Sequence, residues 1–193
     1  TVMQRMPLRC TIFDWLHTGS TSATCRRGTL TPGTTATTFT PNATMTRGDV
    51  VYALWNLAGK PTAKANPAFT DVGFSTDLGK AVAWAHENAI VNGKTESPFV
   101  AGGSVNRQQF AAFMYRYAEA LGYNVSTTGS LSAFNDAKQV SSYATQALAW
   151  ANANKLVNGF SDGTVRPFGT ATRGQSAAII YRFASTLSAA KAA

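Results

Sequence analysis

Three arginines of this chain each directly follow a residue that can cap the start of a helix. Arg47, Arg107 and Arg173 come after a threonine, an asparagine and a threonine. Each also lies 14 positions after a glycine, namely Gly33, Gly93 and Gly159. A cation at the start of a helix opposes the macrodipole, which places positive partial charge there. Three such placements in register indicate an internal repeat and a site built three times to hold an anion.

The composition is that of a globular chain with an anionic partner. Apolar residues make up 45% and charged residues only 13% of the 193 residues, and the formal net charge is +8. An acidic polysaccharide, a nucleic acid or an anionic lipid would complement that charge. Uncharged polar residues replace the missing charges, which is typical of exported bacterial proteins. No apolar run is long enough to cross a bilayer, so we expect no membrane insertion.

Few residues are arranged for catalysis or metal binding. The acidic residues do not recur as a pair, and no Ser-His-Asp spacing stands out, so we expect no enzyme activity. No histidine and cysteine set has metal-ligand spacing, and neither a metal nor another cofactor is predicted. Cys10 and Cys25 can form one disulfide in an exported chain or remain two thiols. The chain starts at Thr1 without a signal peptide, which indicates a processed form or a fragment.

Alignment on the arginines divides the chain into repeats at 1–60, 61–127 and 128–193. The second and third repeats are offset by 66 positions, which pairs Trp84 with Trp150. The first repeat is offset by 60 from the second, and its residues 18–28 have no apolar period where a helix is expected. No structure is predicted for residues 1–29, which are either a degenerate half-repeat or a sequence out of frame. Each repeat otherwise predicts a helix, a loop and a second helix. In the second repeat, Gly93 is expected to end the first helix as a left-handed cap.

The starts of the second helices are well specified. Each cap has an acidic or amide side chain three residues later, which indicates a capping box. The three pairs are Thr46 with Asp49, Asn106 with Gln109, and Thr172 with Gln175. One helix pair cannot bury its apolar face alone, so three pairs must share a core. The predicted fold is therefore mainly α, three helix-loop-helix repeats in a pseudo-threefold bundle with three loop-plus-arginine sites.

These motifs resemble those of the S-layer homology family, whose repeats end in a Thr-Arg-Ala-Glu type motif. The counterparts here are the segments that begin at Thr46, Asn106 and Thr172. A Phe-x-Asp motif recurs at 69–71 and 134–136, and its aspartates, Asp71 and Asp136, are expected to cap a turn or a helix. A Gly-x-x-Asp-Gly-x-x-x-Pro loop spans residues 159–167. The resemblance covers residues 30 to 187.

The resemblance implies a three-pronged helical domain that binds anionic, often pyruvylated, secondary cell wall polysaccharide without covalent bonds. It also implies secretion to a bacterial cell surface, with a wall of Gram-positive type. The motif arginines would contact the acidic sugar, and loop glycines would let the sugar approach the backbone. The implied ligand-binding residues are Arg47, Arg107, Arg173, Gly33, Gly93, Gly159, Asp162, Gly163, Trp84 and Trp150. Arg173 ranks first because its repeat has the complete loop, and Arg47 ranks last.

Other interpretations of the same residues stay open. The arginines could pack their stems on a neighbouring helix and pair with a carboxylate. Trp84 and Trp150 lie among alanines and could be core residues instead of sugar-stacking platforms. The alternative function is a structural or host-protein-binding surface module that keeps the fold without the sugar. Lysines and arginines are scattered along the chain, so we expect no nucleic-acid partner. The oligomeric state is unknown.

Overall fold

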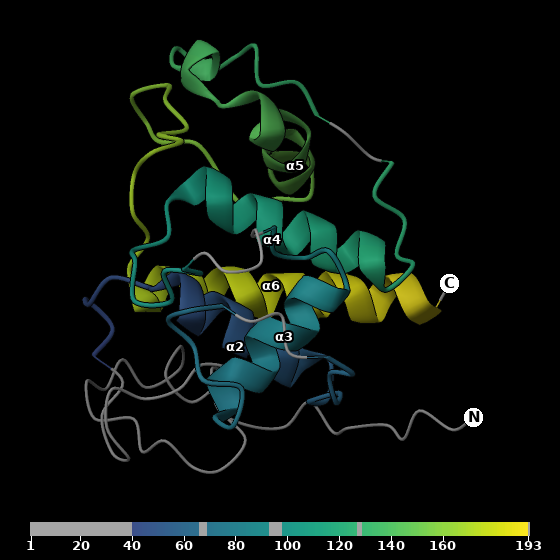
Figure 1. Ribbon diagram of the computed structural model, residues 1–193. Coiled ribbons are helices and arrows are strands. Elements are labelled where there is room, and N and C mark those ends of the chain that lie inside the picture. Colours follow the sequence, from purple (N-terminus) through teal and green to yellow (C-terminus); the bar gives the residue numbers. More distant parts are fainter. Residues whose placement is uncertain (1–39, 66–68, 93–97, 127–128, 193) are drawn as a thin grey trace.

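The computed structural model describes residues 40–65, 69–92, 98–126 and 129–192 (Figure 1). These residues form helices and no strand, which confirms the mainly α class. The elements are α2 (Arg47–Leu57), α3 (Asp77–Glu87), α4 (Arg107–Ala120), a short 3-10 helix η1 (Ala137–Gln139), α5 (Ser142–Ala153) and α6 (Arg173–Ala192). Gly33, Gly93 and both cysteines lie outside the described residues.

The predicted starts of three helices are confirmed, because α2, α4 and α6 begin at the three arginines. The Thr46 hydroxyl accepts a hydrogen bond from the Asp49 amide at 3.1 Å, and the Asp49 carboxylate accepts one from the Thr46 amide at 3.2 Å. The caps of α4 and α6 make the same two reciprocal bonds. Local capping therefore fixes where each of these helices begins.

The predicted end of the first helix in the second repeat is wrong. The helix α3 ends at Glu87, well before Gly93, and Ala89, with φ of 55°, is a left-handed residue that follows it. Lys155 adopts the same conformation after α5, with φ of 56°. Because the helix ends before the predicted position, the chain turns and buries Ile90 and Val91. Burial of two apolar side chains outweighs the cost of about 1 kcal/mol for a left-handed alanine.

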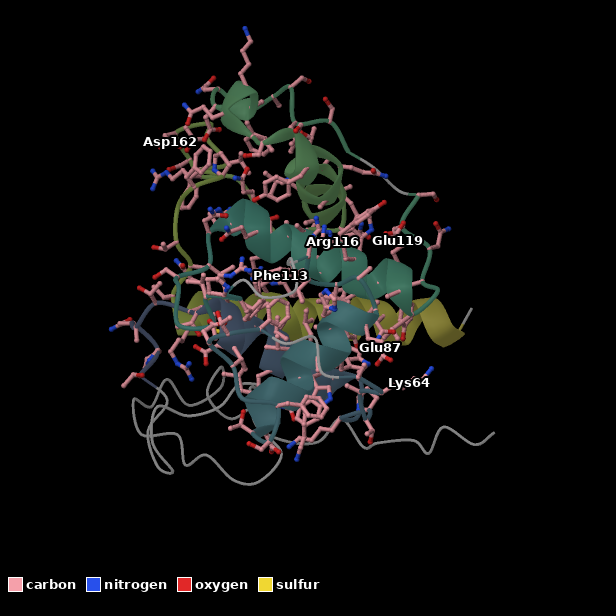
Figure 2. The ribbon with its side chains drawn as sticks, viewed as in Figure 1. Lys64, Glu87, Phe113, Arg116, Glu119 and Asp162 are labelled. Carbon is pink, nitrogen blue, oxygen red and sulfur yellow. The ribbon has the colours of Figure 1, made fainter. Side chains whose placement is uncertain are left out.

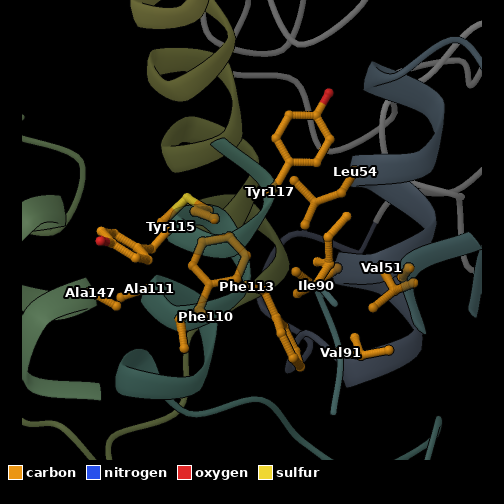
Figure 3. Packing of buried hydrophobic residues seen from close by; sticks show 14 of the residues in the cluster. Val51, Leu54, Ile90, Val91, Phe110, Ala111, Phe113, Tyr115, Tyr117 and Ala147 are labelled. Atoms are coloured by element: carbon orange, nitrogen blue, oxygen red, sulfur yellow. The ribbon is translucent and has the colours of Figure 1, made fainter. Parts of the chain in front are cut away.

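The core forms around α4, which contacts both α5 and α2. In Figure 3 the labelled side chains of α4 lie between Ala147 of α5 and the residues Val51 and Leu54 of α2. Tyr117 packs edge-on against Phe183 of α6, with 5.5 Å between ring centroids. One continuous apolar cluster therefore joins helices from every repeat.

The repeats are joined cyclically through the starts of their second helices. The backbone amides of Arg47, Arg107 and Arg173 donate to the carbonyls of Gly103, Gly169 and Ala43, at 2.8, 2.9 and 2.8 Å. The next amide of each helix donates to a carbonyl two residues earlier in the same loop. The loop of the following repeat thus caps the start of each second helix, and the loop of the first repeat caps that of the third. This arrangement is the expected pseudo-threefold one, whereas the repeat boundaries at residues 60 and 127 stay predictions.

Candidate functional site at the junctions between repeats

Three junctions between repeats hold the three arginines. We name them by the repeats that they join. Junction 1/2 comprises Arg47 and loop 98–104, junction 2/3 comprises Arg107 and loop 158–169, and junction 3/1 comprises Arg173 and residues 40–46. Each arginine therefore meets the loop of the following repeat. The expectation that an arginine and the loop 14 residues before it share one site is wrong, because the chain crosses to another junction between them.

At junction 2/3 the Arg107 side chain lies across the complete loop. Its Nε donates to the Val165 carbonyl at 2.9 Å and its Nη2 to the Asn158 carbonyl at 2.5 Å. The guanidinium carbon lies 4.8 Å from the centroid of the Phe160 ring, and that of Arg166 lies 4.0 Å from it. Burial, together with the charge of Arg166, lowers the pKa of Arg107, and Asp136 opposes this effect. Two cations thus flank one aromatic ring.

Asp162 and Gly163 shape the turn of this loop. The Asp162 carboxylate accepts bonds from the Thr164 hydroxyl at 2.5 Å and from Nη2 of Arg166 at 2.7 Å. These two bonds, together with one from the Thr164 amide, lower the pKa of Asp162 to about 2. Gly163 has φ of 75°, a conformation that favours glycine. Figure 2 shows Asp162 at the outer edge of the loop, far from the core. Asp162 therefore holds Arg166 in place.

Gly159 serves the packing of the loop. A Cβ atom on Gly159 would overlap Cε1 of Phe134 and lie 3.0 Å from its Cζ. Phe134 belongs to the Phe-x-Asp motif, so this glycine lets the motif pack directly beneath the loop. The backbone of Gly159 is approached by a ring of the protein itself, whereas the resemblance had implied an approaching sugar.

The aspartates of the two Phe-x-Asp motifs bind loop amides that lie far along the chain, and sequence reasoning missed these contacts. The Asp71 carboxylate accepts from the amides of Phe99 at 2.6 Å, Val100 at 2.7 Å and Ala101 at 3.1 Å. Asp136 accepts from the amides at positions 165 and 166 in the same manner. Burial opposes ionisation of Asp71, but these backbone bonds outweigh it and lower its pKa. The recurrence of Phe-x-Asp was the available signal, and it was assigned to a local cap.

At junction 1/2 the Arg47 side chain rests on two aromatic rings. Its guanidinium carbon lies 4.8 Å from the centroid of Phe99 and 5.4 Å from that of Phe113 (labelled in Figure 2), and Nε donates to the Phe99 carbonyl at 3.1 Å. Burial lowers the pKa of Arg47, and Tyr143 and Asp71 oppose this effect. Neither Arg47 nor Arg107 forms an ion pair with any residue that the structure describes.

Junction 3/1 differs because its arginine is buried and paired. Arg173 is 4% exposed, and its Nη1 lies 3.0 Å from Oδ2 of Asp49. The premise of the sequence ranking, that each arginine meets the loop of its own repeat, is therefore wrong. Arg173 follows the complete loop in the chain, but that loop faces Arg107. For Arg173 the structure supports the packing and pairing interpretation.

Trp84 and Trp150 belong to the core and not to a sugar-stacking surface. They are 4% and 3% exposed. Trp84 meets Tyr117 edge-on, and Trp150 meets Tyr115 edge-on with 5.6 Å between centroids. A stacked sugar needs an open ring face, so the assignment of both tryptophans to the ligand-binding set is corrected. Exposed aromatic side chains near the junction arginines include Phe160 and Phe168 of loop 158–169, and Tyr143.

Comparison with known proteins places these repeats in a family. The model of the S-layer homology domain matches residues 68–111 and 133–177. An endoglucanase of Bacillus sp. (strain KSM-635) is 32% identical over 148 residues, which are 77% of this chain and 16% of that protein. The exoglucanase XynX of Acetivibrio thermocellus is 30% identical over 152 residues, and an amylopullulanase of Thermoanaerobacterium thermosulfurigenes is 29% identical over 151 residues. The chain spans 14% and 8% of these two proteins.

The matched segments contain the motifs whose geometry is described above. They include the aspartates that bind the loops and the starts of α4 and α6. Domains of this kind attach proteins to the cell wall and are not themselves catalytic. No helix in the described part of the chain is long and apolar enough to span a membrane. Over residues 68–111 and 133–177 the chain belongs to the S-layer homology domain family.

Proposed function

We propose that this chain anchors a larger secreted protein by binding an anionic, pyruvylated cell wall polysaccharide at junctions 1/2 and 2/3. The wall would be of Gram-positive type. The observation that carries the proposal is the state of Arg107. Its cation is partly buried on an aromatic ring, pairs with no acid in the described part of the chain, and has Arg166 as a neighbour. A carboxylate from outside the protein would complete this charge arrangement.

The hydrogen-bonding capacity of Arg107 supports the same proposal. A guanidinium has five N–H donors in a fixed fork, and it binds carboxylates strongly through two of them. Two bonds of Arg107 hold loop carbonyls. The remaining donors can bind a pyruvate ketal carboxylate, and the half-exposed Phe160 ring offers an apolar face for a sugar. Arg47 repeats this arrangement with the Phe99 ring and its carbonyl.

The lengths of the relatives support attachment to a larger protein. The chain spans 16% or less of three bacterial proteins that are named as an endoglucanase, an exoglucanase and an amylopullulanase. A module of this size that recurs in large carbohydrate-active proteins suits an anchoring role. The anchored partner of this chain would then be carried on the same polypeptide.

A sedimentation assay with purified wall sacculi tests the proposal. Arg47→Ala combined with Arg107→Ala should weaken binding at least tenfold, because each charge-assisted pair contributes about 1.5–3 kcal/mol. Lys64→Ala with Arg182→Ala removes the same charge from exposed positions and should leave binding unchanged. Arg107→Lys keeps the charge without the fork and should bind with intermediate strength.

Sacculi stripped of secondary polymer distinguish the alternative function. Binding should disappear on stripped sacculi if the polysaccharide is the ligand. Equal binding to intact and stripped sacculi would refute the proposal and favour a structural or host-protein-binding module. Circular dichroism of each variant separates a loss of binding from a loss of fold.

A further inference from the structure

A left-handed residue recurs at the equivalent position of the loops at junctions 1/2 and 2/3. It is Val100 at junction 1/2, with φ of 61°, and Arg166 at junction 2/3, with φ of 50°. The amide of each donates to Oδ2 of a Phe-x-Asp aspartate, Asp71 or Asp136, at 2.7 Å. The carbonyl of each accepts the amide three residues later, at 2.9 Å for Val100 and 3.0 Å for Arg166. The two loops therefore share one backbone arrangement here, and the side chain is what differs.

At junction 1/2 this position places an apolar group beside the arginine. A Cβ atom built on Gly103 would lie 3.0 Å from Cγ1 of Val100 and 3.6 Å from Cδ of Arg47. Both side chains therefore border the same small space, which the glycine leaves unfilled. Val100 is 52% exposed. An anion bound to Arg47 therefore has an open apolar surface next to it.

At junction 2/3 the same position places hydrogen-bonding groups beside the arginine. A Cβ atom built on Gly169 would lie 3.4 Å from Cβ of Arg166 and 3.6 Å from Cδ of Arg107. Both guanidinium groups lie over the Phe160 ring. Arg166 also pairs with Asp162 at 2.7 Å, and these two side chains are 53% and 48% exposed. An anion bound to Arg107 therefore meets exposed N–H donors and a carboxylate acceptor.

We propose that the residue at position 100 or 166 decides which chemical group each junction accepts beside the bound anion. Junction 1/2 takes a carboxylate with an apolar neighbour, such as a methyl group, whereas junction 2/3 takes a carboxylate with hydroxyl neighbours. A hydroxyl group can accept from the Arg166 guanidinium and donate to the Asp162 carboxylate, and a methyl group can do neither. The inference rests on the proposed function for anion binding at Arg47 and Arg107. It adds that the two junctions recognise different sides of the acidic sugar.

Nuclear magnetic resonance of the arginine Nε–Hε groups tests this specificity with sodium isobutyrate and sodium glycerate as probes. Both probes are small monovalent carboxylates, and the adjacent carbon bears two methyl groups in one and hydroxyl-bearing substituents in the other. The Nε protons of Arg47 and Arg107 are bound to loop carbonyls, which slows their exchange with water. Isobutyrate should bind at Arg47 about threefold more tightly than glycerate, because full burial of one methylene changes affinity about fourfold. The order should reverse at Arg107.

Exchange of the two side chains should exchange the preferences. Val100→Arg should make Arg47 prefer glycerate, and Arg166→Val should make Arg107 prefer isobutyrate. Each new side chain already occurs at the equivalent position with a similar φ, so the loops should keep their conformation. If Arg166→Val does not fold, the result for Val100→Arg decides.

Leu121→Arg and Lys64→Val are the matched controls, because they add one arginine or one valine at exposed positions. Figure 2 shows Lys64 far from Asp162. Both controls should leave the preferences unchanged. An equal preference at Arg47 and Arg107 of the unmodified protein would overturn the inference and keep the proposed anion sites, as would preferences that survive the exchange. Signals that respond to neither carboxylate would overturn the proposed function and this inference together.

Discussion

Gly159→Ala is the substitution whose effect the structure predicts most directly. The new Cβ would overlap Cε1 of Phe134 and lie 3.0 and 3.1 Å from two further ring atoms. Carbon atoms in contact prefer about 3.5–4.0 Å, so the ring must retreat by more than about 1 Å. Phe134 is followed by Asn135 and Asp136, which bind the loop amide or carbonyl groups from residue 162 to 166. The displacement therefore reaches the whole loop at Arg107.

The expected cost is that of overpacking beneath a loop. Such insertions destabilise by about 1–3 kcal/mol. For a chain of this size each kcal/mol lowers Tm by about 2–4 °C, so a cost near 2 kcal/mol corresponds to about 6 °C. The Cβ has no φ penalty here, because Gly159 is not among the residues with positive φ. The whole loss should come from the contact with the ring.

Differential scanning calorimetry of Gly159→Ala against Gly102→Ala provides the comparison. Gly102 lies in the loop of the second repeat, and a Cβ there would meet no atom within 4 Å. The Gly102 variant should melt like the unmodified protein. Equal Tm values for the two variants would refute the packing argument for Gly159. Recovery of Tm by the second-site change Phe134→Leu would support it, since a smaller side chain leaves room for the new methyl group.

Three further substitutions test other contacts. Asp49→Asn should lower the free energy of unfolding in urea by about 3 kcal/mol, because it removes the carboxylate charge that pairs with the buried Arg173 cation. In the double variant with Arg173→Met, the second substitution should cost much less than it does alone. Asp71→Asn should cost about 1 kcal/mol at pH 7. Since backbone bonds outweigh burial and lower the pKa of Asp71, its contribution is present above pH 4 and is lost as pH falls below about 4, so the two proteins should converge in acid. Gly79→Ala should lower Tm more than the Gly159 change, because its Cβ would overlap the backbone carbonyl of Gly73, which cannot rotate away as a ring can.

The starts of the second helices were predictable because the determinants are local. A cap and its partner lie three residues apart, and both bonds form within one turn. The ends of α3 and α5 could not be predicted in the same way. A glycine is the usual sequence signal for a left-handed residue after a helix, whereas here Ala89 and Lys155 adopt that conformation. Those positions are set by the burial of the apolar pair that follows, which is a tertiary effect that no local pattern reports.

The pairing of arginines with loops could not be read from the repeat. A threefold repeat looks the same whether each arginine meets its own loop or the loop of the next repeat. The choice is made by backbone amides that bond across repeats, such as Arg107 to Gly169 and Arg173 to Ala43. The Asp49 and Arg173 pair joins residues 124 positions apart, and the sequence offered no signal to match them.

The cation at each helix start now has a physical explanation. The first amides of α2, α4 and α6 are taken by loop carbonyls and by their caps, so the positive end of the macrodipole is already compensated. The guanidinium points away from the helix to carbonyls and rings at two junctions, and to a carboxylate at the third. An anion would therefore be bound by the side-chain fork and not by the helix start. Substitutions at the fork should then weaken binding, whereas changes of the cap should mainly reduce stability.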